Sequence, residues 1–320
     1  MSLASNPTPK SREGSLLLPA VRLTVWRELG QVLQREHVMG YLLVLPAVLL
    51  LVGLVAYPFV IALWLSLTDA YVGRGGDFIG LRNFLTLFME DDIFRQTLRN
   101  SILFTTSAVA IKTVLGLSLA LLLAQNLRLK RLIRGAVLLP WVIPMVFSTL
   151  GWLWMFDSLY SVINWTLLRL GVIDKGLQWL GTPHLAMIAV ITVNVWRGLP
   201  FYAITLLAGL MSINPELYEA AESDGADAWA RFRYITLPLL RPVLAVVILF
   251  STILTFADFN IVYVLTRGGP VNSTHLFATF AYQAGLQAGK IGEGSAIALF
   301  MFPVLAVIVY LQLHYARREI

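Results

Sequence analysis

Uninterrupted apolar runs of about 20 residues recur along the chain, and they restrict the possible fold more than any other feature of the sequence. At a rise of about 1.5 Å per residue, a helix of that length matches the hydrocarbon thickness of a bilayer. In lipid every backbone N–H and C=O must be bonded within the protein, so such a run folds as a helix. Hydrophobic residues make up 58% of the 320 residues and charged residues 13%, far from the composition of a soluble domain. The sequence therefore predicts an all-α polytopic membrane protein.

Six apolar runs are long enough to cross a membrane, which places both ends of the chain on one side. Fourteen Lys and Arg residues lie in the N-terminal arm, the tail and two of the connections, and eight lie in the other connections. The positive-inside rule then predicts that both termini are cytoplasmic. The predicted spans lie near residues 41–67, 100–126, 135–156, 185–210, 242–265 and 294–314, within a membrane domain of residues 41–318.

Residues 1–40 are expected to form a separate cytoplasmic arm. Residues 1–14 are polar and contain Pro and Ser, which is typical of disordered segments. Leu23, Trp26 and Leu29 then recur at helical spacing while charged residues take the other faces. This pattern predicts an amphipathic helix on the membrane surface before the first span, with an irregular linker as the alternative.

A charged, glycine-containing stretch, EAAESDGADAWARFRYITLP at residues 219–238, separates two apolar runs on the side predicted to be cytoplasmic. Asn214 and Pro215 suit the start of a helix, and the carboxylates that follow suit its positive end. Gly225 can adopt the left-handed conformation that ends it, and a second helix is expected from Ala226 up to Pro238. The prediction is helix, hinge, helix, with one apolar side. That side could cover the chain's own spans or fit a groove on a partner protein.

The residue order in this stretch resembles the cytoplasmic EAA loop of ATP-binding-cassette (ABC) importer permeases. In that family the loop, residues 211–238 here, seats in the nucleotide-binding subunit and carries its motion to the channel. The resemblance therefore implies a coupling role for this segment. The residues concerned are Glu219, Ala220, Ala221, Asp224, Gly225, Trp229, Phe232, Ile235, Leu237 and Pro238.

Three other stretches resemble the maltose-type, carbohydrate-uptake branch of the same family. They are LLPWVIP at 138–144, WRGLPFYAITLLAGL at 196–210 and YVLTRGGP at 263–270. The resemblance implies the channel-forming permease subunit of a sugar importer in the plasma (inner) membrane, working by alternating access. It implies as partners a second homologous permease, two ATPase subunits and an extracytoplasmic sugar-binding protein. A heterodimer of permeases is favoured, and a homodimer stays open.

The sequence lacks the parts of an ATP site. The nearest approach to a phosphate loop, residues 285–290, is one residue short between its glycines, and Ile291 follows where Ser or Thr is needed. ATP and Mg²⁺ are therefore expected on partner subunits, and the chain itself is expected to bind no cofactor and to catalyse no reaction. The absence of Cys and the wide separation of the four His residues predict no metal site. Basic residues are spread along the chain, so no nucleic-acid partner is expected.

Polar residues within the predicted spans are candidates for a translocation path, because their burial in lipid is costly. Ser251, Thr255 and Asp258 lie at four- and three-residue spacing, which places them on one face of a helix. Gly198 and Phe201 share a face of the preceding span beside a proline, where a broken helix would free backbone groups for hydroxyls. Sugars are bound by polar groups at their edges and by an aromatic ring on their apolar face. These five residues are the predicted substrate contacts.

Extending the shared motifs without gaps onto the maltose importer's channel subunit places the same five positions at its sugar contacts. That subunit has Asn and Tyr donors where this chain has Thr255, Asp258 and Phe201, so the identity of the sugar stays open.

Explanations without a sugar also stay open. The Ser251 and Thr255 hydroxyls could bond their own helix carbonyls, and Asp258 could pair with Lys112 or Arg197. A permease of this type for a non-sugar solute is one alternative function. An ion-coupled secondary transporter with Asp258 as a proton site, or a membrane enzyme, would be others.

Overall fold

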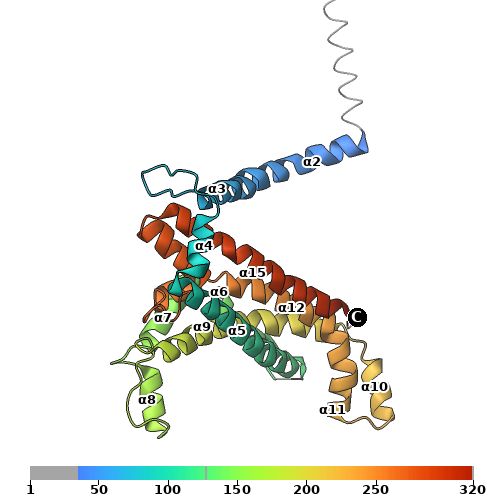
Figure 1. Ribbon diagram of the computed structural model, residues 1–320. Helices are drawn as coiled ribbons and strands as arrows, with labels where there is room; N and C mark the ends of the chain where they lie inside the picture. The colour runs from blue at the N-terminus through green and yellow to red at the C-terminus, as the bar shows by residue number, and fades with distance from the viewer. Residues whose placement is uncertain (1–34, 127, 319–320) are drawn as a thin grey trace, which may run out of the picture. The chain divides into compact units, whose positions relative to one another are not determined.

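The computed structural model describes residues 35–126 and 128–318, which are predominantly helical (Figure 1). Within these ranges β pairing is limited to two isolated bridges, Thr68 with Phe78 and Tyr71 with Arg74. The predicted all-α fold is therefore confirmed for this part of the chain. The amphipathic helix expected before the first span falls on residues outside the described ranges.

The chain divides into two compact units, Met1–Ile61 and Ala62–Ile320. The first unit holds α2 (Glu36–Leu51) and the π-helical η1 (Val52–Ala56), which continue without a break into α3 (Tyr57–Ser66). This helix crosses the boundary between the units, and the three together form the first candidate span. The helices of the second unit are α4 (Arg82–Met89), α5 (Asp92–Ala124), α6 (Lys130–Val142), α7 (Met145–Met155), α8 (Val162–Arg169), α9 (Pro183–Met211), α10 (Glu216–Ser223), α11 (Ala228–Arg231), η2 (Phe232–Thr236), α12 (Leu237–Phe256), α13 (Asn260–Leu265), α14 (Phe277–Tyr282), η3 (Gln283–Gln287) and α15 (Ile291–Arg318).

Five helices in the described ranges are long and apolar enough to cross a membrane, and a bent pair makes a sixth if it counts as one span. The five are Glu36–Ser66, Asp92–Ala124, Pro183–Met211, Ala228–Phe256 and Ile291–His314. Four of the six predicted spans thus correspond to single helices, which begin two to eight residues before the predicted starts and end within two residues of the predicted ends.

The third predicted span, 135–156, is not one straight helix. It consists of α6 and α7, which meet at an angle of 91°. Pro144 follows the break, and Ile143 before it is extended with ψ of 129°. Proline cannot continue an α-helix and disfavours the helical conformation of the preceding residue, which explains the bend.

The fifth predicted span, 242–265, is displaced toward the N-terminus. The second helix of the charged stretch does not stop before Pro238 but runs on as Ala228–Phe256. The π-helical turn η2 widens the backbone just before Pro238, where an N–H is missing, so the helix passes through the proline. The helix ends at Phe256, and the chain restarts as α13 at Asn260.

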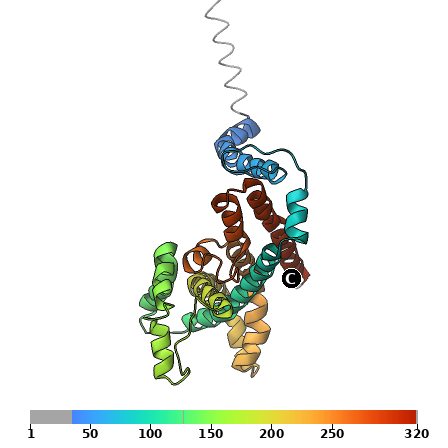
Figure 2. The ribbon, with the colours of Figure 1, turned by 60° about the vertical axis from the view of Figure 1, so that its left-hand side comes forward.

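The second unit is built around α5, α9 and α12, each of which packs against the other two (Figures 1 and 2). A Cβ added at Gly116 of α5 would lie only 2.3 Å from Tyr202 Cβ of α9, so glycine permits this close helix contact. Pro200 does not break α9, which is continuous around it, contrary to the expectation of a broken helix. Figure 1 shows α10 and α11 at one end of α12, and α13 follows its other end.

Candidate functional site

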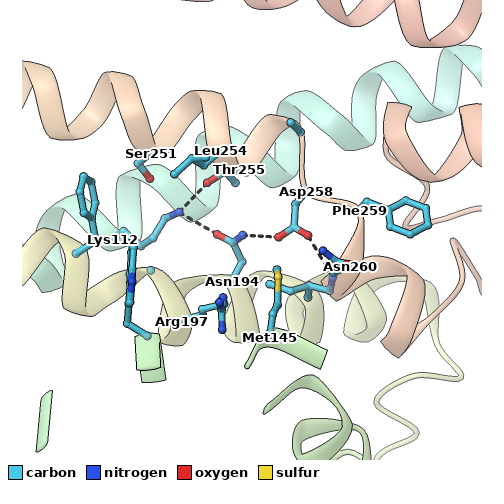
Figure 3. A pocket seen from close by; sticks show the side chains of 15 residues that line it. Lys112, Met145, Asn194, Arg197, Ser251, Leu254, Thr255, Asp258, Phe259 and Asn260 are labelled. Atoms are coloured by element: carbon cyan, nitrogen blue, oxygen red, sulfur yellow. Dashed lines mark hydrogen bonds between the residues drawn. The ribbon is translucent and has the colours of Figure 1, made fainter. Parts of the chain in front are cut away.

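A cavity of about 360 Å³ lies where α5, α9 and the end of α12 meet, and all five predicted substrate contacts line it (Figure 3). These are Gly198, Phe201, Ser251, Thr255 and Asp258. Gly198 and Phe201 come from α9, whereas Ser251 and Thr255 come from α12. Asp258 lies beyond the end of α12, in the break before α13, and not on the helix face predicted for it. Its side chain nevertheless faces the same cavity.

A chain of hydrogen bonds crosses the wall of this cavity (Figure 3). Lys112 Nζ donates to Asn194 Oδ1 at 2.9 Å and to Thr255 Oγ1 at 2.7 Å. Asn194 Nδ2 in turn donates to Asp258 Oδ2 at 2.9 Å. The second oxygen, Asp258 Oδ1, accepts from the backbone N–H of Ile261 at 3.2 Å, at the start of α13. These hydrogen bonds therefore link α5, α9, α12 and the break after α12.

Asn194 separates the two buried charges of this network. Lys112 is 3% exposed and Asp258 is 6% exposed. They are joined through the Asn194 amide and do not form the direct ion pair considered from the sequence. Arg197, the other candidate partner, instead donates from Nη1 to Ile143 O at 3.2 Å, at the bend between α6 and α7. Buried charges are tolerated in a membrane protein when such partners surround them.

Gly198 makes room for the Lys112 side chain. A Cβ added to Gly198 would lie 2.6 Å from Lys112 Cδ and 3.3 Å from Lys112 Nζ. Any larger residue would therefore force the Lys112 side chain to shift from its present position. Gly198 therefore has two roles in the structure: it lines the cavity, and it leaves room for the Lys112 side chain from α5.

The apolar side of the cavity is aromatic. Phe201 stacks on Trp141 of α6 with ring centroids 5.5 Å apart and planes 25° apart. Both rings line the cavity, from α6 and α9, whereas the Ser251 and Thr255 hydroxyls come from α12. A cavity that combines ring faces with hydrogen-bonding groups suits a molecule with both an apolar face and hydroxyl edges.

Sequence reasoning missed Asn194 and Trp141 as cavity residues and treated Lys112 and Arg197 only as possible charge partners. A signal for Asn194 was present, because it is a polar residue within a span and lies four residues before Gly198, on the same helix face. Trp141 gave no comparable signal, since an aromatic residue in a span is usually a packing residue.

The charged stretch has the hinged form predicted for it. Gly225 adopts the left-handed conformation with φ of +83° after α10, and Asn214 Oδ1 accepts from Glu216 N at the helix start. Glu222 and Arg231 form an ion pair of 2.9 Å across the hinge. Further along, the Tyr218 hydroxyl lies 3.0 Å from Thr236 Oγ1. These contacts hold α10 against the beginning of the long helix Ala228–Phe256.

The surface of this stretch is exposed, including its large aromatic residues. Trp229 is 69% exposed and Tyr234 is 77% exposed. Glu219, Ala220 and Asp224 are exposed as well. Trp229 and Tyr234 are thus not used to cover the chain's own spans, whereas Phe232 and Ile235 are half-buried and Leu237 packs against the core. Exposed aromatic residues beside charges are common at protein interfaces.

Membrane-length helices around a cavity lined by hydrogen-bonding and aromatic side chains, with an exposed hinged helix pair at one end of a long helix, are typical of a channel subunit of a transport protein. The chain belongs to the family of binding-protein-dependent transport system inner membrane components, whose sequence profile matches residues 112–320. It is therefore a multi-pass membrane protein, and the motif in its hinged stretch is typical of the family.

Relatives of known assignment span nearly the whole chain. The chain is 38% identical over 288 residues to the trehalose/maltose transport system permease protein MalF of Thermococcus litoralis, covering 89% of this chain and 96% of that protein. It is 36% identical over 296 residues to the sulfoquinovosyl glycerol transport system permease protein SmoG of Agrobacterium fabrum, covering 91% and 94%. It is 34% identical over 278 residues to the trehalose transport system permease protein SugA of Mycobacterium tuberculosis, covering 86% and 88%.

Solved structures share the fold. One is a bacterial ABC transporter involved in the import of the acidic polysaccharide alginate, with a TM-score of 0.76 at 24% identity over 92% of this chain and 99% of that chain. Another is an alginate ABC transporter in complex with an alginate pentasaccharide-bound periplasmic protein, with a TM-score of 0.76 at 23% identity over 92% and 97%. The helical arrangement described above is thus that of importer permeases.

Proposed function

We propose that this chain is the channel-forming permease subunit of an ABC importer that takes up a sugar handed over by an extracytoplasmic binding protein. The observation that carries the proposal is the cavity in which a hydrogen-bonding chain faces the stacked Phe201 and Trp141 rings. Three relatives that cover most of the chain are named for carbohydrates, namely trehalose, maltose and sulfoquinovosyl glycerol. A disaccharide or a related glycoside is the substrate class that fits both.

In this function each group of the cavity has a separate task. The Phe201 and Trp141 rings pack against the apolar face of a sugar, and Ser251, Thr255 and Asp258 bond hydroxyl groups at its edge. No covalent chemistry is required of the chain. In residues 35–126 and 128–318 no group of three or more His, Asp and Glu side chains could hold a metal ion.

The energy for transport comes from ATP hydrolysis on two partner ATPase subunits. Each of them docks on one hinged helix pair, and this chain supplies one such pair at residues 216–231. A second, homologous permease therefore supplies the other, and the two permeases enclose the path between them, most simply as a heterodimer. The hinged pair and both termini lie on the cytoplasmic side, as the distribution of Lys and Arg favours.

The proposal predicts that the chain, purified together with its permease, ATPase and binding-protein partners, accumulates a sugar in vesicles when ATP is supplied. Trehalose, maltose and sulfoquinovosyl glycerol form the test panel, and at least one of them is expected to stimulate ATP hydrolysis in the presence of the binding protein. Stimulation and uptake are measured on the same vesicles. Uptake that collapses when an uncoupler is added at constant ATP would instead support an ion-coupled transporter.

A further inference from the structure

The direction of the hydrogen bonds around Lys112 determines what the cavity offers to a ligand. An ammonium group has three N–H donors and no acceptor, so both of its bonds must run outward from Nζ. The Thr255 oxygen accepts one of them at 2.7 Å. The proton of the Thr255 hydroxyl is thus left to be donated elsewhere.

Several helix threonines in the described part of the chain donate that proton to a carbonyl of their own helix. Thr113, Thr192 and Thr252 each donate to the carbonyl four residues earlier, at 2.8 Å. Thr255 makes no such bond within the described residues, although it lies on the same helix as Thr252 and both are 2% exposed. The alternative in which the Thr255 hydroxyl merely satisfies its own helix is therefore wrong. The Thr255 hydroxyl proton can instead be donated to a group in the cavity, which Thr255 lines.

We infer that Lys112 is a positioning residue for the sugar site. By donating to Thr255 Oγ1 and Asn194 Oδ1, it orients Thr255 as a hydrogen-bond donor toward the cavity and holds the Asn194 amide so that its NH₂ group meets Asp258. The site then presents a fixed donor from α12, which selects a sugar with an acceptor oxygen at that position. This inference rests on the proposed function and adds a residue from α5 to it.

The geometry around Lys112 supports this role independently. Gly198 has no side chain at the point where any Cβ would collide with Lys112 Cδ at 2.6 Å. The Lys112 side chain therefore passes over α9 at residue 198 on its way to Thr255 and Asn194. There is room for it because residue 198 is glycine. A lysine that served only to neutralise Asp258 would not need contact with Thr255, because charge interactions act over longer distances.

The test compares Lys112→Met, Thr255→Val and the double variant in the assembled, vesicle-reconstituted complex. The probe is whichever sugar of the panel (trehalose, maltose and sulfoquinovosyl glycerol) the wild-type complex transports. Each single variant is expected to raise the KM for uptake about tenfold, because one hydrogen bond to the sugar is lost or misdirected. The double variant is expected to stay well below the roughly hundredfold rise that independent effects would give, because part of the effect of Lys112 acts through Thr255.

Thr192→Val is the matched control, because its hydroxyl bonds to Ile188 O of its own helix and lies outside the cavity. It is expected to leave the KM unchanged. A Lys112→Met complex whose KM is unchanged, whatever its yield or maximal rate, would overturn the inference and assign Lys112 a purely structural role. Multiplicative effects in the double variant would overturn it as well. A wild-type complex that transports no sugar of the panel would contradict the proposed function, and the inference with it.

Discussion

Replacing Gly225 by valine is expected to leave the chain in the membrane but to separate ATP hydrolysis from sugar uptake, so that hydrolysis continues while most uptake is lost. Gly225 has a φ of +83°, a conformation that costs an L-residue about 1–2 kcal/mol and a β-branched residue more. No atom lies within 4 Å of a Cβ added there, so the effect is conformational and not a collision. The hinge would then open at a different angle and misplace α10 relative to the long helix.

A matched control separates backbone conformation from loss of glycine as such. Asparagine adopts the left-handed conformation far more readily than other residues, so Gly225→Asn is expected to retain most uptake. Glu219→Lys reverses an exposed charge on α10 without altering the hinge, and it is expected to uncouple as well if α10 contacts the ATPase. Both activities are measured in vesicles containing the complete complex. Normal uptake by both Gly225→Val and Glu219→Lys would remove the coupling role from this segment.

Replacing Gly198 by alanine is expected to weaken substrate affinity strongly, although only one methyl group is added. The new Cβ would lie 2.6 Å from Lys112 Cδ, well inside van der Waals contact, so the Lys112 side chain must shift, and we expect its bonds to Asn194 and Thr255 to weaken. Asp258 would then lose its nearby positive charge in a buried setting, where an unpaired charge is costly. We expect the KM for uptake to rise about tenfold or more, as measured for the transported sugar.

The control for this prediction is a glycine in open space. Gly151→Ala on α7 meets no atom within 4 Å and is expected to leave the KM unchanged. The double variant Gly198→Ala with Lys112→Ala removes the collision, so it is expected to be no worse than Lys112→Ala alone. If Gly198→Ala transports with an unchanged KM, the packing of Lys112 over α9 has no role in the site.

The sequence predicted the helices better than their breaks. The apolar runs place the first, fourth and sixth spans within about five residues and the second within eight, because span length follows from membrane thickness. The prolines were ambiguous, since Pro144 accompanies a 91° bend, whereas Pro200 and Pro238 lie within continuous helices. Whether a proline breaks a span depends on packing and on local turns such as η2, which the sequence alone does not reveal.

The sequence predicted five of the residues that line the candidate cavity but not the hydrogen bonds that connect its polar groups. Helical spacing brought Ser251 and Thr255 to one face and Gly198 and Phe201 to another, and the structure places both faces on one cavity. Asp258 was assigned to the right cavity for an inexact reason, since it lies in the break after α12. Asn194 as a link between Lys112 and Asp258 depends on the side-by-side packing of α5 and α9, which spacing along one helix cannot predict.

The continuity of the helix Ala228–Phe256 has a mechanical consequence for how an importer of this type would work. Its 29 residues make a rod roughly 43 Å long at 1.5 Å per residue. One end begins beside the exposed Trp229, and the other carries Ser251 and Thr255. A tilt of about 5° at the first end would shift the second by about 4 Å over that length. Motion applied by a neighbouring subunit would therefore be carried to the hydroxyl groups along one continuous helix.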